Sequence, residues 1–255
     1  MLFWRALIAG FLLCLGLSLA APANAESSFA NWAAIVVAGD WHAHSGGPSE
    51  VFDNGRRDLA KAFTAIGISP ANLREFSVRP SHYQTEPLSK SSPNIIYQQL
   101  SDLTRQARGG CLIYFTSHGA PNGVIVDDRI WPPAMMAQMI DATCGERPTV
   151  VVISACFSGV FVPALEGPNR MIMTAARRDR TSFGCGDDDR YTYFDGCVLQ
   201  VLPHAHDFEA LAGGVRACVT QREAETGATP PSQPQLAIGP VLHPMLPLYA
   251  FASSP

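Results

Sequence analysis

The sequence predicts an α/β fold in which helices cover both faces of a mostly parallel sheet. Residues 149–153 form an unbroken run of apolar and β-branched residues that stops at small and polar ones, as in a central strand buried on both faces. Segments of strand and helix character alternate along the chain, which favours parallel strands joined by helices. With 255 residues, 47% of them hydrophobic, the chain can fill one such core.

The individual elements follow from local patterns. We expect strands at residues 31–38, 72–76, 110–116, 149–154, 170–175 and 235–242, and helices at 51–66, 94–107, 132–143 and 208–219. The first helix has apolar residues at helical spacing and ends at Gly67, and the third begins with Pro132. Residues 77–93 and 181–193 read as long polar loops, and residues 223–234 as a linker-like stretch before the last strand.

The first 25 residues have the features of a secretory signal peptide. Arg5 supplies the positive charge, residues 6–19 are apolar, and Ala23-Asn24-Ala25 fits a cleavage site. The apolar run of about 14 residues is shorter than the roughly 18 that a membrane-spanning helix needs. We therefore expect an exported protein, periplasmic or secreted, whose mature part (residues 26–255) is a single domain without stable membrane association.

Charge and composition exclude several classes of partner. The formal net charge is -4, and no cluster of Lys or Arg suggests nucleic acid or an anionic membrane as a partner. The pairs His42/His44 and His204/His206 could each supply half of a zinc site, and residues 187–189 are three consecutive aspartates. Such groups are typical of polar loops, so we expect no metal and no cofactor.

Six cysteines follow the predicted signal peptide: Cys111, Cys144, Cys156, Cys185, Cys197 and Cys218. In an oxidising compartment we expect disulfides, but the sequence leaves the pairing open. Cys185 and Cys197 flank a polar loop and could close it. Cys144 and Cys218 lie at helix ends and are a second possible pair, and Cys111 reads as a core residue. A nucleophile at Cys156 would leave an odd number, which indicates that some thiols stay free.

Two of the expected strands end in residues suited to catalysis. His118 follows the strand at 110–116, and Cys156 follows the strand at 149–154. If the strands are parallel neighbours, both side chains lie on one edge of the sheet, where ligands of such sheets bind. A cysteine attacks as its thiolate and needs a nearby base. A lone buried cysteine is usually structural, but this pairing predicts a nucleophile with its base.

Three short motifs occur in order at the expected strand ends: Ser117-His118-Gly119, Ser154-Ala155-Cys156-Phe157-Ser158-Gly159 and Thr174-Ala175-Ala176. In this order they resemble the legumain-like cysteine peptidases, family C13 of the caspase-like clan. The resemblance extends over residues 33–200. It implies a caspase-like three-layer fold and a catalytic dyad of His118 and Cys156. It also implies an oxyanion hole formed by the main-chain N–H groups of Gly119 and Cys156.

The chain departs from this family in the pocket for the residue before the cleaved bond. Legumains cut after asparagine and place an acidic residue two positions before the nucleophile, where this chain has Ser154. Their Arg-His pair aligns approximately with Asn54-Gly55, followed by Arg56-Arg57. The candidate substrate-binding residues are Asn54, Arg56, Ser154, Ser182 and Asp195. Specificity stays open between asparagine and aspartate, the latter favoured if an arginine reaches the pocket.

The sequence thus predicts an exported cysteine endopeptidase that hydrolyses peptide bonds in peptide or protein substrates through an acyl-thioester. A transpeptidase that uses the same dyad remains an alternative, as does a non-catalytic peptide-binding homologue with Cys156 in a disulfide. A zinc hydrolase is a third alternative. The need for proteolytic activation, for which residues 223–234 are a candidate cleavage site, is not decided by the sequence, nor is the oligomeric state.

Overall fold

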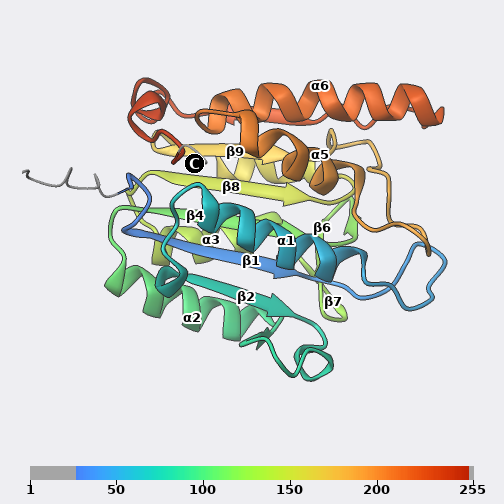
Figure 1. The fold of residues 1–255 in the computed structure, drawn as a ribbon, viewed down its shortest axis with the longest axis horizontal. Coiled ribbons are helices and arrows are strands. Elements are labelled where there is room, and N and C mark those ends of the chain that lie inside the picture. The colour runs from blue at the N-terminus through green and yellow to red at the C-terminus, as the bar shows by residue number, and fades with distance from the viewer. Residues whose placement is uncertain (1–26, 253–255) are drawn as a thin grey trace, which may run out of the picture.

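Seven strands form the main sheet of residues 27–252, the part of the chain that this computed structural model describes (Figure 1). In spatial order they are β10 (Gln235–Ile238), β9 (Arg170–Thr174), β8 (Thr149–Ser154), β4 (Gly110–Thr116), β1 (Trp32–Ala38), β2 (Leu73–Ser77) and β3 (Ser89–Lys90). The strands run parallel except β10, which is antiparallel to β9. The predicted signal peptide, residues 1–25, lies outside the described residues.

Helices cover both faces of this sheet. One face carries α1 (Val51–Ala65), α5 (Tyr193–Val201) and α6 (Phe208–Thr226), and the other carries α2 (Pro93–Gln106), α3 (Pro133–Thr143) and the short α4 (Val162–Leu165). In Figure 1, α1 and α5 lie in front of the strands and α3 lies behind them. The predicted three-layer α/β architecture is confirmed.

The alternation of strand side chains divides the core into two layers. In β1, Ala34 and Val36 pack with α1, α5 and α6, whereas Ile35 and Val37 pack with α2 and α3. Every residue of β1, β4 and β8 is buried. Because both faces of these strands are covered, their sequences are continuously apolar rather than alternating.

The expected elements are present with boundaries shifted by a few residues, but two helices, α4 and α5, were missed. Helix α5 begins after the hydroxyl of Thr192, which accepts a hydrogen bond from the Asp195 N–H. A polar loop precedes it, and Gly196 weakens its helical pattern. Helix α6 runs to Thr226, so the linker-like stretch 223–234 begins inside it, and the buried Glu223 carboxylate accepts from the Ser232 N–H.

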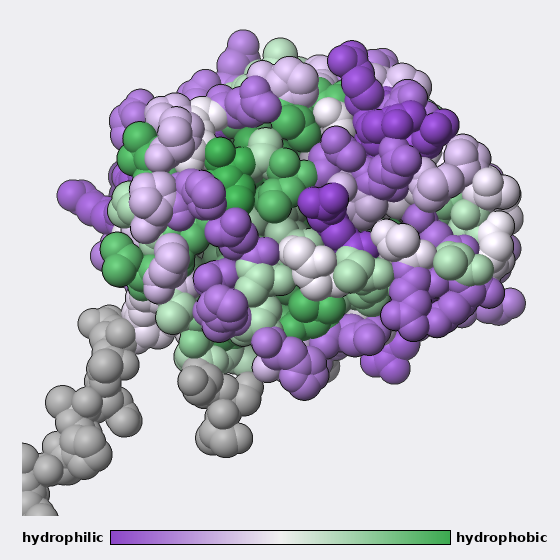
Figure 2. Space-filling model, turned by 90° about the horizontal axis from the view of Figure 1, so that it is seen from above, coloured by the Kyte–Doolittle hydropathy of each residue, from purple (hydrophilic) through white to green (hydrophobic). Residues whose placement is uncertain are grey.

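The surface on the side of α6 has a hydrophilic part and a more hydrophobic part. Figure 2 shows hydrophilic residues gathered toward the carboxyl ends of the strands and hydrophobic residues nearer the two chain ends. In the C-terminal segment, Val241 and Leu248 are exposed. None of the helices within residues 27–252 combines the length and apolarity needed to cross a bilayer.

Two disulfides connect the described residues, Cys111–Cys144 and Cys197–Cys218, whereas Cys156 and Cys185 are free. Neither pair suggested by the sequence forms. Cys111 begins β4 and Cys144 follows α3, and these elements share one core layer. Cys197 lies on α5, which packs against α6 carrying Cys218. Both bonds therefore join elements that pack against each other, and the loops beside the cysteines give no sign of this packing in the sequence.

Replacing Cys111 and Cys144 together with alanine should lower the free energy of unfolding by about 3–4 kcal/mol, because the bond closes a long loop in the unfolded chain. Urea denaturation of the double variant measures the loss. Cys185→Ser is the matched control and should cost about 1 kcal/mol or less, since this thiol is free and half-buried. Equal losses in the two variants would contradict the assigned pairing.

Candidate active site

The pairing of β4 with β8 places His118 beside Cys156. Thr116 of β4 is in register with Ser154 of β8, and each catalytic candidate lies two residues further along its strand. A Cβ atom on Gly119 would overlap the carbonyl oxygen of Cys156, so the two segments are in direct contact. Only glycine allows this approach. The structure therefore places the segment that carries His118 against the backbone of Cys156.

The site lies where the order of the strands reverses. From β1 the chain continues to β2 on one side, and β4 returns to the other side of β1. The loops that follow neighbouring strands separate at such a point and leave a crevice beyond the strand ends. In this protein the loop after β1 and the segment after β4 contact each other at that point, since the Gly39 N–H donates to the Thr116 carbonyl at 2.9 Å and the Asp127 N–H donates to the Gly39 carbonyl at 2.8 Å. The strand arrows point toward this end of the sheet, on the right in Figure 1.

The turn after Cys156 is held by the segment that follows β9. Phe157 has the left-handed backbone conformation (φ 57°), and its N–H donates to the carbonyl of Arg180 at 2.8 Å. The buried Ser158 hydroxyl accepts from the Ala176 N–H at 3.1 Å, and the Gly159 N–H donates to the Ala176 carbonyl at 2.8 Å. These bonds turn the chain sharply directly after the nucleophile.

The Cys156 thiol is half-buried and contacts the backbone of Ser182. The Ser182 N–H donates to Sγ at 3.2 Å, and Sγ lies 3.6 Å from the Ser182 carbonyl oxygen. Burial raises the pKa of Cys156, while the hydrogen bond with the Ser182 backbone acts in the opposite direction. Because burial is the larger effect, the thiol needs a base to become nucleophilic.

Backbone and ring contacts orient the His118 imidazole. Its Nε2 atom lies 3.0 Å from the main-chain carbonyl oxygen of His42, and its ring packs edge to face on Phe52 at 5.0 Å. Because a carbonyl oxygen only accepts hydrogen bonds, Nε2 carries the proton. In the neutral ring Nδ1 then holds the lone pair that can accept a proton.

Two main-chain N–H groups near the thiol are available to a ligand. No acceptor for the Cys156 N–H occurs among residues 27–252. Gly119 belongs to β5 (Gly119–Ala120), which pairs with β6 (Gly123–Val126), itself paired with β7 (Arg129–Trp131). Because the Ile125 N–H donates to the His118 carbonyl, the Gly119/Val124 pair is a non-hydrogen-bonded one, and the Gly119 N–H points away from β6.

Comparison with known proteins agrees with this geometry. Residues 98–211 match the sequence profile of the Peptidase C13 family, and the matched segment contains both His118 and Cys156. The matched segment covers 114 of the 255 residues, and this similarity supports a peptidase of the C13 type. The chain is therefore a cysteine-type peptidase.

The fold of this chain is similar to that of caspase-1 from Spodoptera frugiperda. The TM-score is 0.58 at 14% sequence identity, over 84% of this chain and 88% of that chain. At this identity the likeness concerns the fold alone. A search of curated proteins gives no match.

Three of the five candidate substrate-binding residues lie on β8 or close to the segment that follows it. Ser154 is buried, and its hydroxyl lies 3.1 Å from that of Thr192. The Asp195 carboxylate is fully buried and accepts from the hydroxyls of Tyr114, at 2.7 Å, and Thr116. Ser182 contacts Cys156 through its backbone, as described above. Asp195 thus supports the pocket from beneath rather than facing solvent.

The other two candidates lie on α1. The side chain of Asn54 is half-buried and accepts from the Arg57 guanidinium at 2.6 Å. Arg56 is fully buried and ion-paired with Asp53 at 3.1 Å, and with Glu75 and Glu86 at 2.6 and 2.8 Å. The sequence-based assignment of Arg56 to substrate binding was therefore wrong, because its guanidinium is occupied by these carboxylates.

The sequence missed the carbonyl of His42, the ring of Phe52 and the free Cys185. A main-chain carbonyl leaves no signal in residue types, and Cys185 was expected to pair. Burial, followed by the negative charge of a Cys156 thiolate, raises the pKa of Cys185 to about 11. Cys185 also packs against Phe52, the residue that contacts His118. This second thiol therefore lies close to the site and stays protonated at neutral pH.

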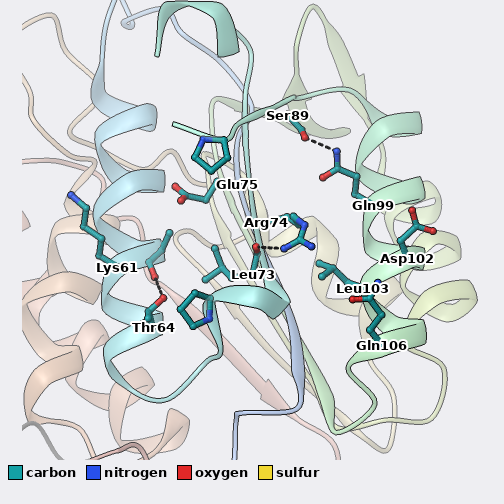
Figure 3. Close-up of a pocket in the computed structure, with 13 residues that line it drawn as sticks. Lys61, Thr64, Leu73, Arg74, Glu75, Ser89, Gln99, Asp102, Leu103 and Gln106 are labelled. Atoms are coloured by element: carbon teal, nitrogen blue, oxygen red, sulfur yellow. Dashed lines mark hydrogen bonds between the residues drawn. The ribbon is translucent and has the colours of Figure 1, made fainter. Parts of the chain in front are cut away.

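The polar loop residues weighed as metal ligands are spread apart. Among residues 27–252, no group of three or more His, Cys, Asp or Glu side chains could hold a metal ion. Asp187 instead accepts from the Ser45 hydroxyl at 2.6 Å. A cavity of about 720 Å³ lies along β2 between α1 and α2, lined by Lys61, Arg74 and Glu75 among others (Figure 3). None of the dyad residues lines that cavity.

The peptidase should lose stability with rising pH because of Asp195. Burial raises the pKa of its carboxyl above the usual 3.8, so the folded state favours the protonated form. This contribution is complete below about pH 4 and is lost as the pH rises through the raised pKa.

Asp195→Asn removes the titration at nearly constant size. From about pH 4 to pH 8 the unfolding free energy of the wild type should therefore fall relative to that of the variant. Urea denaturation at a series of pH values measures this difference. Parallel profiles, or a relative gain by the wild type, would contradict the raised pKa.

Proposed function

We propose that the protein is an exported endopeptidase in which Cys156 attacks the peptide carbonyl and His118 is its base. The observation that carries this proposal is the free Cys156 thiol at a strand end directly beside the His118–Gly119 segment. The orientation of the imidazole supports it, since the proton on Nε2 faces the His42 carbonyl and leaves Nδ1 as the basic atom.

The reaction has two halves. In the first, the Cys156 proton moves to His118, and the thiolate forms a C–S bond with the carbonyl carbon of the substrate. The resulting oxyanion receives hydrogen bonds from the N–H groups of Gly119 and Cys156. As the C–N bond breaks, His118 returns the proton to the leaving amine, and an acyl-thioester remains. In the second half, water gives a proton to His118 while its oxygen forms a C–O bond with the acyl carbon. The C–S bond then breaks, the acid is released, and the proton returns from His118 to the Cys156 sulfur.

For the residue before the cleaved bond we propose asparagine ahead of aspartate. An acidic side chain would need a free cation in the pocket, but Arg56 is already paired with carboxylates. Of the other candidates, Ser182 lies next to the thiol through its backbone, and Asn54 is a half-buried neutral side chain on α1. Such neutral donors and acceptors suit an amide.

Two further observations bear on the alternatives. A binding homologue with Cys156 in a disulfide is disfavoured, because this thiol is free. Export is supported by the disulfides Cys111–Cys144 and Cys197–Cys218, since such bonds persist in oxidising compartments. Mass measurement of the protein from the periplasm or medium tests export: a mature chain should begin near Glu26.

Cys156→Ala should abolish hydrolysis of peptides containing asparagine, and His118→Ala should reduce it by about 10²-fold or more. Both variants should keep the wild-type melting temperature within a few degrees, because both positions lie on the rim. Cys185→Ser is the matched control and should retain most of the activity. Full activity in Cys156→Ala would overturn the proposal. Mass analysis of products formed with an added amine separates hydrolysis from transpeptidation.

Gly119→Ala should reduce kcat by about 10²-fold or more, because the new Cβ atom would overlap the Cys156 carbonyl and shift an oxyanion donor. Steady-state kinetics measures kcat and KM for the variant. Gly213→Ala provides a control, since Gly213 lies on α6 with open space around it and an ordinary helical backbone. Wild-type kcat in Gly119→Ala would argue against a role for this N–H.

A further inference from the structure

Asp40, the second residue after β1, makes a compact set of hydrogen bonds to the chain that follows it. Its side chain is largely buried. One oxygen, Oδ1, accepts from the Trp41 N–H at 2.6 Å and the His42 N–H at 3.1 Å, and it lies 2.7 Å from His42 Nδ1. An aspartate that binds the backbone two residues ahead fixes the conformation of a turn.

The turn fixed by Asp40 contains the carbonyl that orients His118. Since Asp40 Oδ1 binds both the main-chain N–H and the ring of His42, this residue is restrained at two points. The same residue presents its carbonyl to His118 Nε2 at 3.0 Å. A rotation of this peptide would remove the acceptor that keeps the His118 proton on Nε2 and its lone pair on Nδ1.

Other contacts also hold this loop, and one of them, the hydrogen bond from the Ala43 N–H to the Gly47 carbonyl at 2.7 Å, restrains the same peptide group as the His42 carbonyl. The Ser49 N–H donates to the Trp41 carbonyl at 2.9 Å, and the Arg79 guanidinium lies 4.6 Å from the centre of a Trp41 ring. Asp187 accepts from Ser45 at the far end of the loop. The loop therefore has supports that would remain if the Asp40 carboxylate were removed.

We propose that Asp40 is a positioning residue of the peptidase, which acts through the His42 carbonyl to hold His118 in its catalytic orientation and tautomer. The proposal rests on the function assigned to His118 above. It implies that loss of the carboxylate affects the chemical step more than substrate binding, because Asp40 contacts the base and not the peptide.

The first test compares Asp40→Ala with Asp40→Asn. The alanine variant should lower kcat by about 10- to 100-fold with KM within about threefold, since small displacements of a catalytic group have effects of this size. Asparagine keeps an oxygen that accepts from both N–H groups and should restore most of the loss. If alanine prevents folding, Asp40→Ser, with a weaker acceptor, should fall between the wild type and that loss.

Asp187→Ala is the matched control. It removes a carboxylate that binds the same loop at Ser45, so it should leave kcat near the wild-type value. His42→Ala separates the ring from the carbonyl and should lose less activity than Asp40→Ala. An equal or larger loss would assign the role to the His42 ring and overturn the proposal, as would wild-type kcat in Asp40→Ala.

A spectroscopic measurement tests Asp40 independently of turnover. In the ¹⁵N-labelled protein, His118 (assigned with a His118→Gln variant) should show the Nε2–H tautomer, and Asp40→Ala should show a mixture of tautomers. Unchanged His118 signals in Asp40→Ala would overturn the positioning role. If instead the wild type shows no hydrolysis while the signals shift, the proposed function fails and the positioning role stands.

Discussion

Burial of the neighbouring strands β1, β4 and β8 in register is the constraint on which the rest of the structure depends. Both faces of these strands are covered by helices, so a slip of one residue would exchange the side chains of the two core layers. The register of Thr116 with Ser154 carries directly into the positions of His118 and Cys156. The hydrophobic effect therefore determines where the segments that carry these two polar residues meet, although neither residue contributes much to the core itself.

The chemistry of the site is controlled by backbone groups more than by charged side chains. The thiol contacts the backbone of Ser182, the imidazole binds the carbonyl of His42, and the oxyanion donors of the proposed mechanism are main-chain N–H groups. Charged residues nearby are engaged elsewhere: Arg56 is surrounded by carboxylates, and Asp195 lies beneath the rim. Dipoles held by a rigid sheet need no reorganisation when charge develops, which suits a reaction that passes through an oxyanion.

The features that the sequence predicted wrongly or missed include two disulfides, the position of Arg56 and helix α5. The suggested disulfides joined cysteines that flank a loop or end a helix, but the bonds form between elements that pack face to face. Arg56 was assigned to the pocket because it lies near the aligned segment, yet its position on α1 points it into a cluster of acids. Helix α5 was missed because Thr192, its N-cap, follows a long polar loop. For the disulfides and Arg56 the outcome depends on partners distant in the sequence, whereas the start of α5 depends on a local cap within a polar segment.

The sequence by itself determined the α/β class, the order of most strands and helices, and the residues at the ends of the two strands that carry His118 and Cys156. These features are encoded locally, since apolar runs and glycine stops reflect burial and turn geometry within a few residues. Only the tertiary structure decided the disulfide pairing, the burial of Arg56 and the contact between His118 and the carbonyl of His42. Those features require segments far apart in the chain to meet, and a main-chain carbonyl is common to every residue type.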